Sequence, residues 1–264
     1  MNRNQRAQIA QETLDIFKQG YYMQANAKTN CQSKFSAEFI SERQLDVLAI
    51  PASTFTPQYE VVNESVIETI MRHGSETCGI LNFASAKNPG GGFLKGSRAQ
   101  EEALAASSDL YLSQMQAPEF YNTNRSCRTA LYTHNMIYSQ GINFIRDGNM
   151  SLVKSPIEAN VLTSPAVNAG AYYKNENGSK STVTAVMEKR IRYILNVLAA
   201  KGNRTIILGA FGCGVFANDA NDVANIFYQL LKNERTENYF ERIVFAVYDS
   251  GGQIYNTFCQ RFVK

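Results

Sequence analysis

Apolar positions recur with helical spacing in several segments of this chain. In NQRAQIAQETLDIF, Ile9, Ile16 and Phe17 fall on one helical face, and SAEFISERQ has a similar pattern. The first 45 or so residues are therefore expected to be mostly helical, and a polar link between Pro51 and Pro57 is expected to follow. The same spacing predicts further helices over residues 62–71, 101–112, 181–200, 218–231 and 253–262.

Short apolar runs that end in Gly, Pro or Asn predict strands between these helices. They cover residues 77–83, the segments LYTHNMIYS, INFIRDG and EANVLTSPAV, and residues 204–209 and 242–248. The polar segment NAGAYYKNENGSKS is expected to be an exposed loop. Strands that alternate with helices predict an α/β fold in which a sheet lies between helix layers.

Composition excludes several classes of protein. A hydrophobic content of 44% is enough for a sizeable core, whereas a net charge of +3 is too small to indicate stable binding of nucleic acid. No apolar run reaches the length of a membrane span, and the first residues do not resemble a secretory signal. Five cysteines without a CxxC pair suit reduced thiols, so a cytoplasmic protein is expected.

The chain has only two histidines, His73 and His134, and neither forms a pair at metal-ligand spacing. A zinc hydrolase of the usual kind is therefore not expected, and no metal or cofactor is predicted. His73 ends a predicted helix, where a cation suits the helix dipole. His134 lies in an apolar segment, where a structural role is favoured over catalysis.

Two glycine-rich loops each follow a predicted strand and precede a predicted helix. The first contains Gly90, Gly91 and Gly92 after Pro89, and the second is LGAFGCGVFAND, residues 208–219. Glycine lets a ligand approach the backbone closely, and successive free N–H groups can bind an anion. Two such loops at the carboxyl ends of strands predict one ligand with a diphosphate and a sugar. Neither loop contains the lysine of a P-loop, which argues against a kinase or ATPase.

Glu101 and Glu102 follow the first glycine loop, in the first turn of a predicted helix. Acidic residues are common there because they suit the helix dipole, so the pair alone does not establish catalysis. Adjacent helical residues project about 100° apart, so the two carboxyls cannot flank one glycosidic bond as in ordinary glycosidases. If the pair is catalytic, one carboxyl transfers protons and the other holds the substrate.

The glycine triplet, the seven residues that follow it and Gln-Glu-Glu resemble the signature of poly(ADP-ribose) glycohydrolases. The block ILNFASAKNPGGGFLKGSRAQEEALAASSDLY, with LGAFGCGVFAND downstream, is similar to the microbial type of this family. The resemblance implies a macrodomain-like fold that binds ADP-ribose, with a mixed sheet between helices. It also implies one catalytic domain over residues 1–264, in which a helical extension, 1–50, packs on a core, 51–264.

Carried over by position, the resemblance implies that Glu102 is the catalytic acid and then base. Glu101 would bind ribose hydroxyls beside the scissile bond. The implied substrate-binding residues are Asn88, Gly90, Gly91, Gly92, Gln100, Gly212, Cys213, Gly214, Val215 and Phe216. A basic residue is more usual in the family where this chain has Ala217, and TSPAVNAG departs from the usual order of Pro and Ala.

The expected activity is hydrolysis of the ribose–ribose bond of poly(ADP-ribose) by a monomer without a cofactor. An acid near neutral pH needs a raised pKa, which partial burial and the charge of Glu101 would give Glu102. Two alternatives remain open on the sequence: a hydrolase of mono-ADP-ribosylated protein or nucleic acid, and a macrodomain that only binds ADP-ribose. An unrelated sugar-nucleotide enzyme would leave both motif matches as coincidence.

Overall fold

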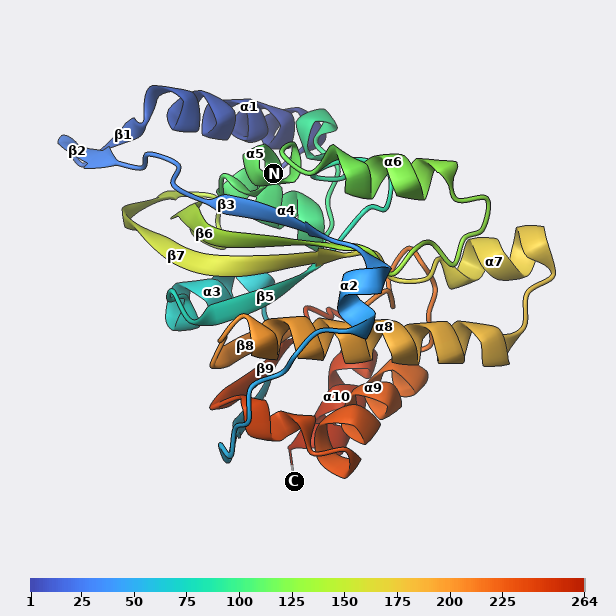
Figure 1. The fold of residues 1–264 in the computed structure, drawn as a ribbon. Coiled ribbons are helices and arrows are strands. Elements are labelled where there is room, and N and C mark those ends of the chain that lie inside the picture. Colours follow the sequence, from blue (N-terminus) through green and yellow to red (C-terminus); the bar gives the residue numbers. More distant parts are fainter. Residues whose placement is uncertain (264) are drawn as a thin grey trace.

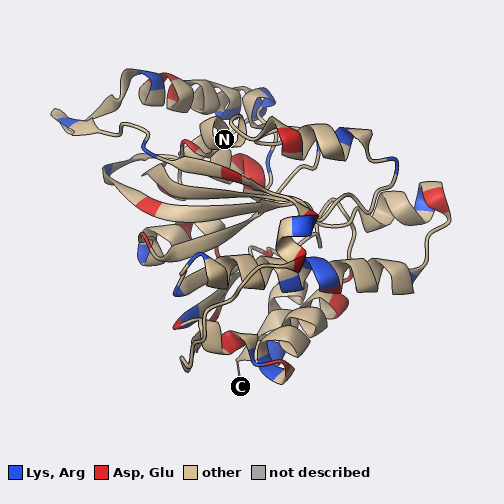
Figure 2. Ribbon diagram, in the orientation of Figure 1, with Lys and Arg blue, Asp and Glu red and all other residues tan. Residues whose placement is uncertain are grey.

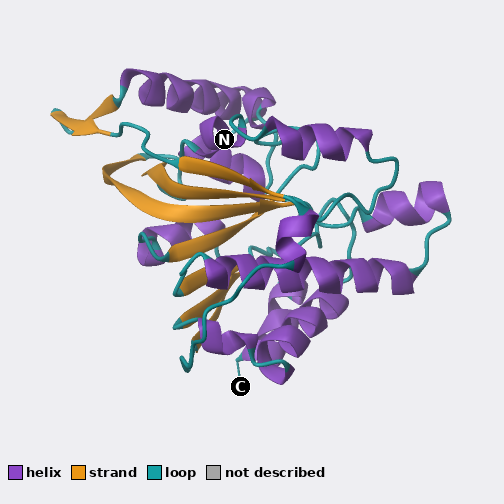
Figure 3. Cartoon of the chain, viewed as in Figure 1, coloured by secondary structure: helices purple, strands orange, loops and turns teal. Residues whose placement is uncertain are grey.

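A twisted seven-stranded sheet forms the centre of the computed structural model, which describes residues 1–263 (Figures 1 and 3). The strand order is β3-β6-β7-β5-β8-β9-β4, and a separate hairpin contains β1 and β2. Strands β7, β5, β8, β9 and β4 run parallel, whereas β6 is antiparallel to both of its neighbours. The strands are β1 Tyr21–Gln24, β2 Ala27–Asn30, β3 Ser36–Ile40, β4 Gln58–Val62, β5 Cys78–Phe83, β6 Met136–Arg146, β7 Leu152–Ser164, β8 Thr205–Leu208 and β9 Arg242–Ala246.

Helices cover both faces of this sheet. The α-helices are α1 Arg3–Gln19, α2 Glu42–Asp46, α3 Val66–His73, α4 Gln100–Ser107, α5 Leu110–Gln114, α6 Pro118–Ser126, α7 Ala169–Glu176, α8 Lys180–Ala200, α9 Ala220–Tyr228 and α10 Gln253–Phe262. Short 3₁₀ turns lie at Phe93–Lys95 (η1) and Thr236–Tyr239 (η3), and a π turn at Gln229–Asn233 (η2) follows α9. The α/β fold class, with a mixed sheet between helix layers and a helix at the N-terminus, is confirmed.

Alternation along the central strands divides the core into two layers. Leu81 of β5 and Ile206 of β8 pack with α8, α9 and α10, whereas Ile80 and Ile207 pack with α3, α4 and α5. Because successive side chains of a strand point to opposite faces, one apolar strand can serve both layers. This explains why TCGILNF and RTIILG are apolar at almost every position.

The predicted helix over residues 36–44 is wrong, because Ser36–Ile40 forms strand β3 and pairs with β6 in the main sheet. Helix α2 begins only after Ser41, which forms a capping box with Gln44. The helical description of residues 1–50 therefore holds for α1 and α2 but not for β1, β2 and β3. The division into an extension and a core stays a prediction.

Three other segments differ from their predicted structure. The expected exposed loop contains helix α7, which Asn168 caps by accepting a hydrogen bond from the Ala171 N–H. The expected link between Pro51 and Pro57 contains no helix or strand, as predicted, but the unpredicted strand β4 follows it, and the predicted helix over residues 62–71 begins only at Val66 as α3. The predicted helix over residues 101–112 breaks at Ser108 and Asp109, where Ser108 bridges to Phe144 and the Asp109 carboxylate accepts from the Asn143 N–H.

Charge is distributed without a strip of one sign. Acidic and basic residues are interspersed along the ribbon (Figure 2). Within residues 1–263, the structure contains no helix with the length and apolar character of a membrane span.

Candidate active site

The strands β4, β5, β8 and β9 are parallel, so the loops after them lie at one edge of the sheet. These loops line a cleft of about 810 Å³, the first cleft. Its walls include Ser65 after β4, Phe83 at the end of β5, Gly214 after β8 and Tyr248 after β9, with Glu102 at the start of α4. This part of the cleft thus lies where α/β proteins commonly bind ligands, and the rest is lined mainly by α1, α3, α4 and residues 148–150.

A second cleft, of about 590 Å³, lies between the first glycine loop and helices α5 and α6. Asn88, Gly91 and Gly92 line it on one side, and Tyr111 and Met115 on another. Glu102 lines both clefts. The carboxyl implicated in proton transfer is therefore placed where the two clefts meet.

Glu101 is almost completely buried, with 3% of its surface exposed. Its Oε2 accepts a 2.7 Å hydrogen bond from the Ser85 N–H. Its Oε1 accepts from the Asn82 and Gln114 side-chain amides, at 3.3 and 3.1 Å. These donors fix the carboxylate in one orientation, which suits a group that positions a substrate.

Gln114 connects this carboxylate to the first glycine loop. Its Oε1 accepts from the Gly90 N–H at 2.7 Å, while its Nε2 donates to Glu101 and lies 3.4 Å from Thr163 Oγ1. Asn82 also donates to Thr163 Oγ1, at 3.2 Å. Sequence reasoning missed Asn82, Gln114 and Ser85. A polar residue at the centre of the apolar strand CGILNF was the available signal for Asn82.

Glu102 is half-buried and makes one hydrogen bond within the described chain: its Oε1 accepts from the Gly92 N–H at 2.9 Å. Its Oε2 therefore has no recorded partner among residues 1–263 and is available to a ligand. A carboxyl held through one oxygen and free at the other can present a proton in a fixed direction, as general acid–base catalysis requires.

Burial raises the pKa of Glu101 to about 8, with a smaller contribution from the charge of Glu102, while the three N–H donors oppose the shift. The folded protein therefore retains a proton that the unfolded chain releases near pH 4.3. Stability should fall as the pH rises from about 4.3 to about 8 and then level off. The melting temperature of the wild type should thus fall relative to that of Glu101→Gln over this window. A difference in melting temperature between the two proteins that stays constant over this pH range would contradict the prediction.

The Gln100 side chain binds the backbone of β5. Its Oε1 accepts from the Phe83 N–H at 2.9 Å, and its Nε2 donates to the Leu81 carbonyl at 2.7 Å. Strand β8 pairs with β5 only as far as Ile80, so the Gln100 amide continues the ladder beyond that point. It thereby fixes the start of α4, and with it Glu101 and Glu102, to the sheet. Its contact with substrate stays a prediction.

The first glycine loop folds tightly against the glutamate pair. Gly90 and Gly91 have φ values of 63° and 59°, and the Gly91 N–H donates to the Asn88 carbonyl. A Cβ at Gly91 would collide with the Glu102 carboxylate and lie 3.1 Å from Glu101 Oε2. Glycine is needed at this position both for the backbone conformation and for the space beside the two carboxyls.

The second glycine loop has several backbone donors without a partner. Among the residues that the structure describes, no hydrogen bond is recorded for the N–H groups of Gly212, Gly214, Val215 and Phe216. The Cys213 N–H, in contrast, donates to the Ala210 carbonyl. Asn218 closes the loop by donating to the carbonyls of Val167 and Gly212. This arrangement suits an anion bound by several backbone N–H groups.

Side chains of the second loop differ in their exposure. Val215 is 91% exposed, which leaves its backbone accessible to a ligand. Phe216 is half-buried, and its ring centroid lies 6.1 Å from that of Tyr132. Burial raises the pKa of the Cys213 thiol to about 12, so this cysteine is not a reactive thiolate at neutral pH.

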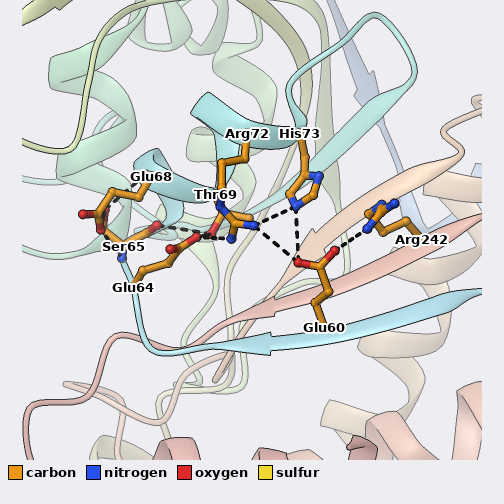
Figure 4. A network of polar contacts seen from close by, with 8 residues as sticks. All are labelled: Glu60, Glu64, Ser65, Glu68, Thr69, Arg72, His73 and Arg242. Carbon is orange, nitrogen blue, oxygen red and sulfur yellow. Dashed lines mark hydrogen bonds and ion pairs between the residues drawn. The ribbon is translucent and has the colours of Figure 1, made fainter.

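A network of polar and charged side chains holds α3 against β4 (Figure 4), and its members Glu64, Ser65 and Glu68 line the first cleft. Glu60 of β4 pairs with Arg72, His73 and Arg242, and Arg72 also pairs with Glu64. His73 therefore has a structural partner at the end of α3, and it lines neither cleft.

His134 also lies outside both clefts. Its ring packs edge-on against Tyr193, and burial lowers the pKa of His134 to about 4. These positions support structural roles for the two histidines. No group of three or more His, Cys, Asp or Glu side chains suited to a metal occurs within the described part of the chain.

Comparisons with known proteins agree with this geometry. The model of the microbial-type PARG catalytic domain matches residues 10–147, and PARG denotes poly(ADP-ribose) glycohydrolase. No curated protein sequence matches the chain. The structure is similar to poly(ADP-ribose) glycohydrolase from Thermomonospora curvata, with a TM-score of 0.89, 33% identity and coverage of 98% of this chain and 100% of that one.

Two ligand-bound structures are also similar. One is the Thermomonospora curvata enzyme bound to the inhibitor ADP-HPD, with a TM-score of 0.87, 32% identity and coverage of 98% of this chain and 100% of that one. The other is the Deinococcus radiodurans enzyme in complex with ADP-ribose, with a TM-score of 0.79, 36% identity and coverage of 85% and 93%. The chain therefore belongs to the microbial-type poly(ADP-ribose) glycohydrolase family.

Proposed function

We propose that this chain hydrolyses the ribose–ribose O-glycosidic bond of poly(ADP-ribose), with Glu102 as the only acid and base. The difference between the two adjacent glutamates carries the proposal. Glu101 is buried and held by three donors, whereas Glu102 is held through one oxygen where the two clefts meet. One carboxyl positions the substrate and the other transfers protons.

The bond that breaks joins C1″ of a ribose to O2′ of the next unit. Protonated Glu102 gives its proton to O2′ as the bonding electrons move to that oxygen, and positive charge develops on the ribose. The Glu102 carboxylate then removes a proton from water, whose oxygen bonds to C1″. The products are ADP-ribose and a chain with a free 2′-hydroxyl, and Glu102 regains its proton.

The ADP-ribose unit extends along the first cleft in this proposal. The free N–H groups of the second glycine loop bind its diphosphate, and its distal ribose lies beside Glu102 where the two clefts meet, against Gly91 and Asn88 of the first glycine loop. The lining of this cleft also includes Phe83, Val247, Ile254 and other apolar side chains, which suit a nucleobase. The diphosphate also stabilises positive charge on the nearby ribose.

A direct assay tests the activity. The protein should release ADP-ribose from poly(ADP-ribose), measured by chromatography of the products. Mono-ADP-ribosylated protein in a parallel reaction tests the alternative, because the same pocket would hold the same ADP-ribose. Release only from the mono-modified protein would replace the proposed substrate. Binding of ADP-ribose without release from either would leave a binding domain.

Binding of the product provides a separate prediction. ADP-ribose should raise the melting temperature in a concentration-dependent way, because a ligand that binds only the folded state stabilises it by mass action. AMP should raise it less, because AMP leaves the N–H groups of Gly214, Val215 and Phe216 only partly used. Differential scanning fluorimetry and calorimetry measure both effects. Equal increases in melting temperature with the two ligands would contradict the proposed binding site of the diphosphate and distal ribose.

A further inference from the structure

The second cleft contains cations that the mechanism does not use. Lys95 of η1 and Arg125 of α6 line it, both are exposed, and neither forms an ion pair within the described residues. Glu102 is the one acidic residue among those lining this cleft. Apart from Glu102, the charged residues that line this cleft are therefore basic, which suits an anionic group.

Aromatic and apolar side chains form the rest of its wall. The Arg125 guanidinium lies 5.9 Å from the ring centroid of Tyr121, and Leu94 and Met115 are 43% and 53% exposed. Tyr121 is buried, and its hydroxyl has no hydrogen-bond partner in the part of the chain that the structure describes. Buried polar groups usually have a partner, so this wall retains unused hydrogen-bonding capacity.

The position of Glu102 indicates which side of the scissile bond the second cleft would hold. The proposed scissile bond lies at Glu102, and the ADP-ribose unit that is released extends along the first cleft. The chain on the other side of that bond must leave Glu102 by another path. The second cleft begins at Glu102 and has a volume typical of ligand pockets.

We propose that the second cleft is the subsite for the leaving unit of the polymer. Lys95 and Arg125 bind the diphosphate of this nucleotide unit, and the apolar rim packs against its sugar and base. This inference rests on the proposed function and extends it, because it assigns residues that recognise the part of the substrate beyond the bond that breaks. Such a subsite would favour the polymer over ADP-ribose glycosides with small leaving groups.

Two substrates with the same glycone test this subsite. One is poly(ADP-ribose), and the other is ADP-ribose that carries 4-nitrophenol at C1″ in the anomeric configuration of the polymer. In Lys95→Ala/Arg125→Ala, kcat/KM on the polymer should fall by about 10- to 100-fold, the usual effect of losing charge-assisted contacts. On the 4-nitrophenyl glycoside it should stay within about twofold of wild type, because this leaving group does not reach the cations. Arg125→Glu should reduce kcat/KM on the polymer further. Added salt should lower kcat/KM on the polymer more for the wild type than for the double variant.

Arg128→Ala is the matched control, because Arg128 is an exposed arginine that lines neither cleft. It should leave both rates unchanged. Wild-type cleavage of the polymer by the double variant would overturn the subsite, as would equal losses on both substrates at an unchanged melting temperature. A wild-type protein that releases no ADP-ribose from polymer would overturn the proposed function, and the subsite with it.

Discussion

Replacement of Glu102 by glutamine should lower the turnover number on poly(ADP-ribose) by about 10²–10⁴-fold, the usual effect of losing a positioned proton donor. Glutamine keeps the size of the side chain, and its amide oxygen can still accept from the Gly92 N–H. It cannot give up and regain a proton. Affinity for ADP-ribose should therefore change little, and single-turnover release of ADP-ribose measures the loss of the chemical step.

Glu119→Gln is the control for this variant. Glu119 lies in the first turn of α6, as Glu102 lies in the first turn of α4, but it is exposed and lines neither cleft. A glutamate that serves only the helix dipole should cost a few tenths of a kcal/mol in stability and nothing in rate. If Glu102→Gln behaves like Glu119→Gln, Glu102 is not the acid.

Gly91→Ala should reduce turnover on the order of 10²-fold while the protein still folds. The new Cβ would lie 3.0 Å from Glu102 Cδ and closer to Oε1, so the carboxyl must move away from its place beside the Gly92 N–H. Misplacement of a catalytic group by about 1 Å can cost this much rate. Steady-state kinetics on polymer, with circular dichroism to confirm the fold, measure the effect.

Alanine at position 91 would also lose stability through its backbone conformation, because Gly91 has φ 59°. This effect needs its own control. Gly202 has φ 73°, and a Cβ there would have no neighbour within 4 Å. Gly202→Ala should therefore lose about 1–2 kcal/mol of stability from the left-handed conformation and retain its activity. Equal activities of the two alanine variants would show that the space beside Glu102 is not needed for catalysis.

Segments with a long, unambiguous pattern were predictable from sequence. Helices α8 and α10 and strands β5, β8 and β9 lie within a residue or two of their predicted ranges. Strand β3 was not predictable in this way, because SAEFI is short and owes its conformation to pairing with β6, about 100 residues away in the chain. Strand β6 was divided in the prediction at Gly141, since glycine usually marks a turn. In the structure Gly141 forms a bulge, and the strand continues beyond it.

The site was predictable where its residues are contiguous in sequence. The glycine loop and the glutamate pair are neighbours in the chain, so their proximity follows from one motif. The donors that hold Glu101 come from β5, the loop after it and α5. Thr163 of β7 accepts hydrogen bonds from two of them, Asn82 and Gln114, and only the folded chain brings these residues together. The raised pKa expected at Glu102 stays a prediction. Burial raises the pKa of its neighbour Glu101, because the 100° between adjacent side chains turns Glu101 toward the sheet.

Helix α1 also has a practical consequence for handling the protein. Its Arg3 and Arg6 side chains donate to the carbonyls of Lys95 and Gly96, directly after the first glycine loop, and Met1 lines the first cleft. An affinity tag joined to Met1 would therefore extend from the wall of the first cleft, and deletion of α1 would remove the two hydrogen bonds that support Lys95 and Gly96. The C-terminal helix α10 ends on the opposite side of the sheet (Figure 1), so tags and surface attachment are better placed there.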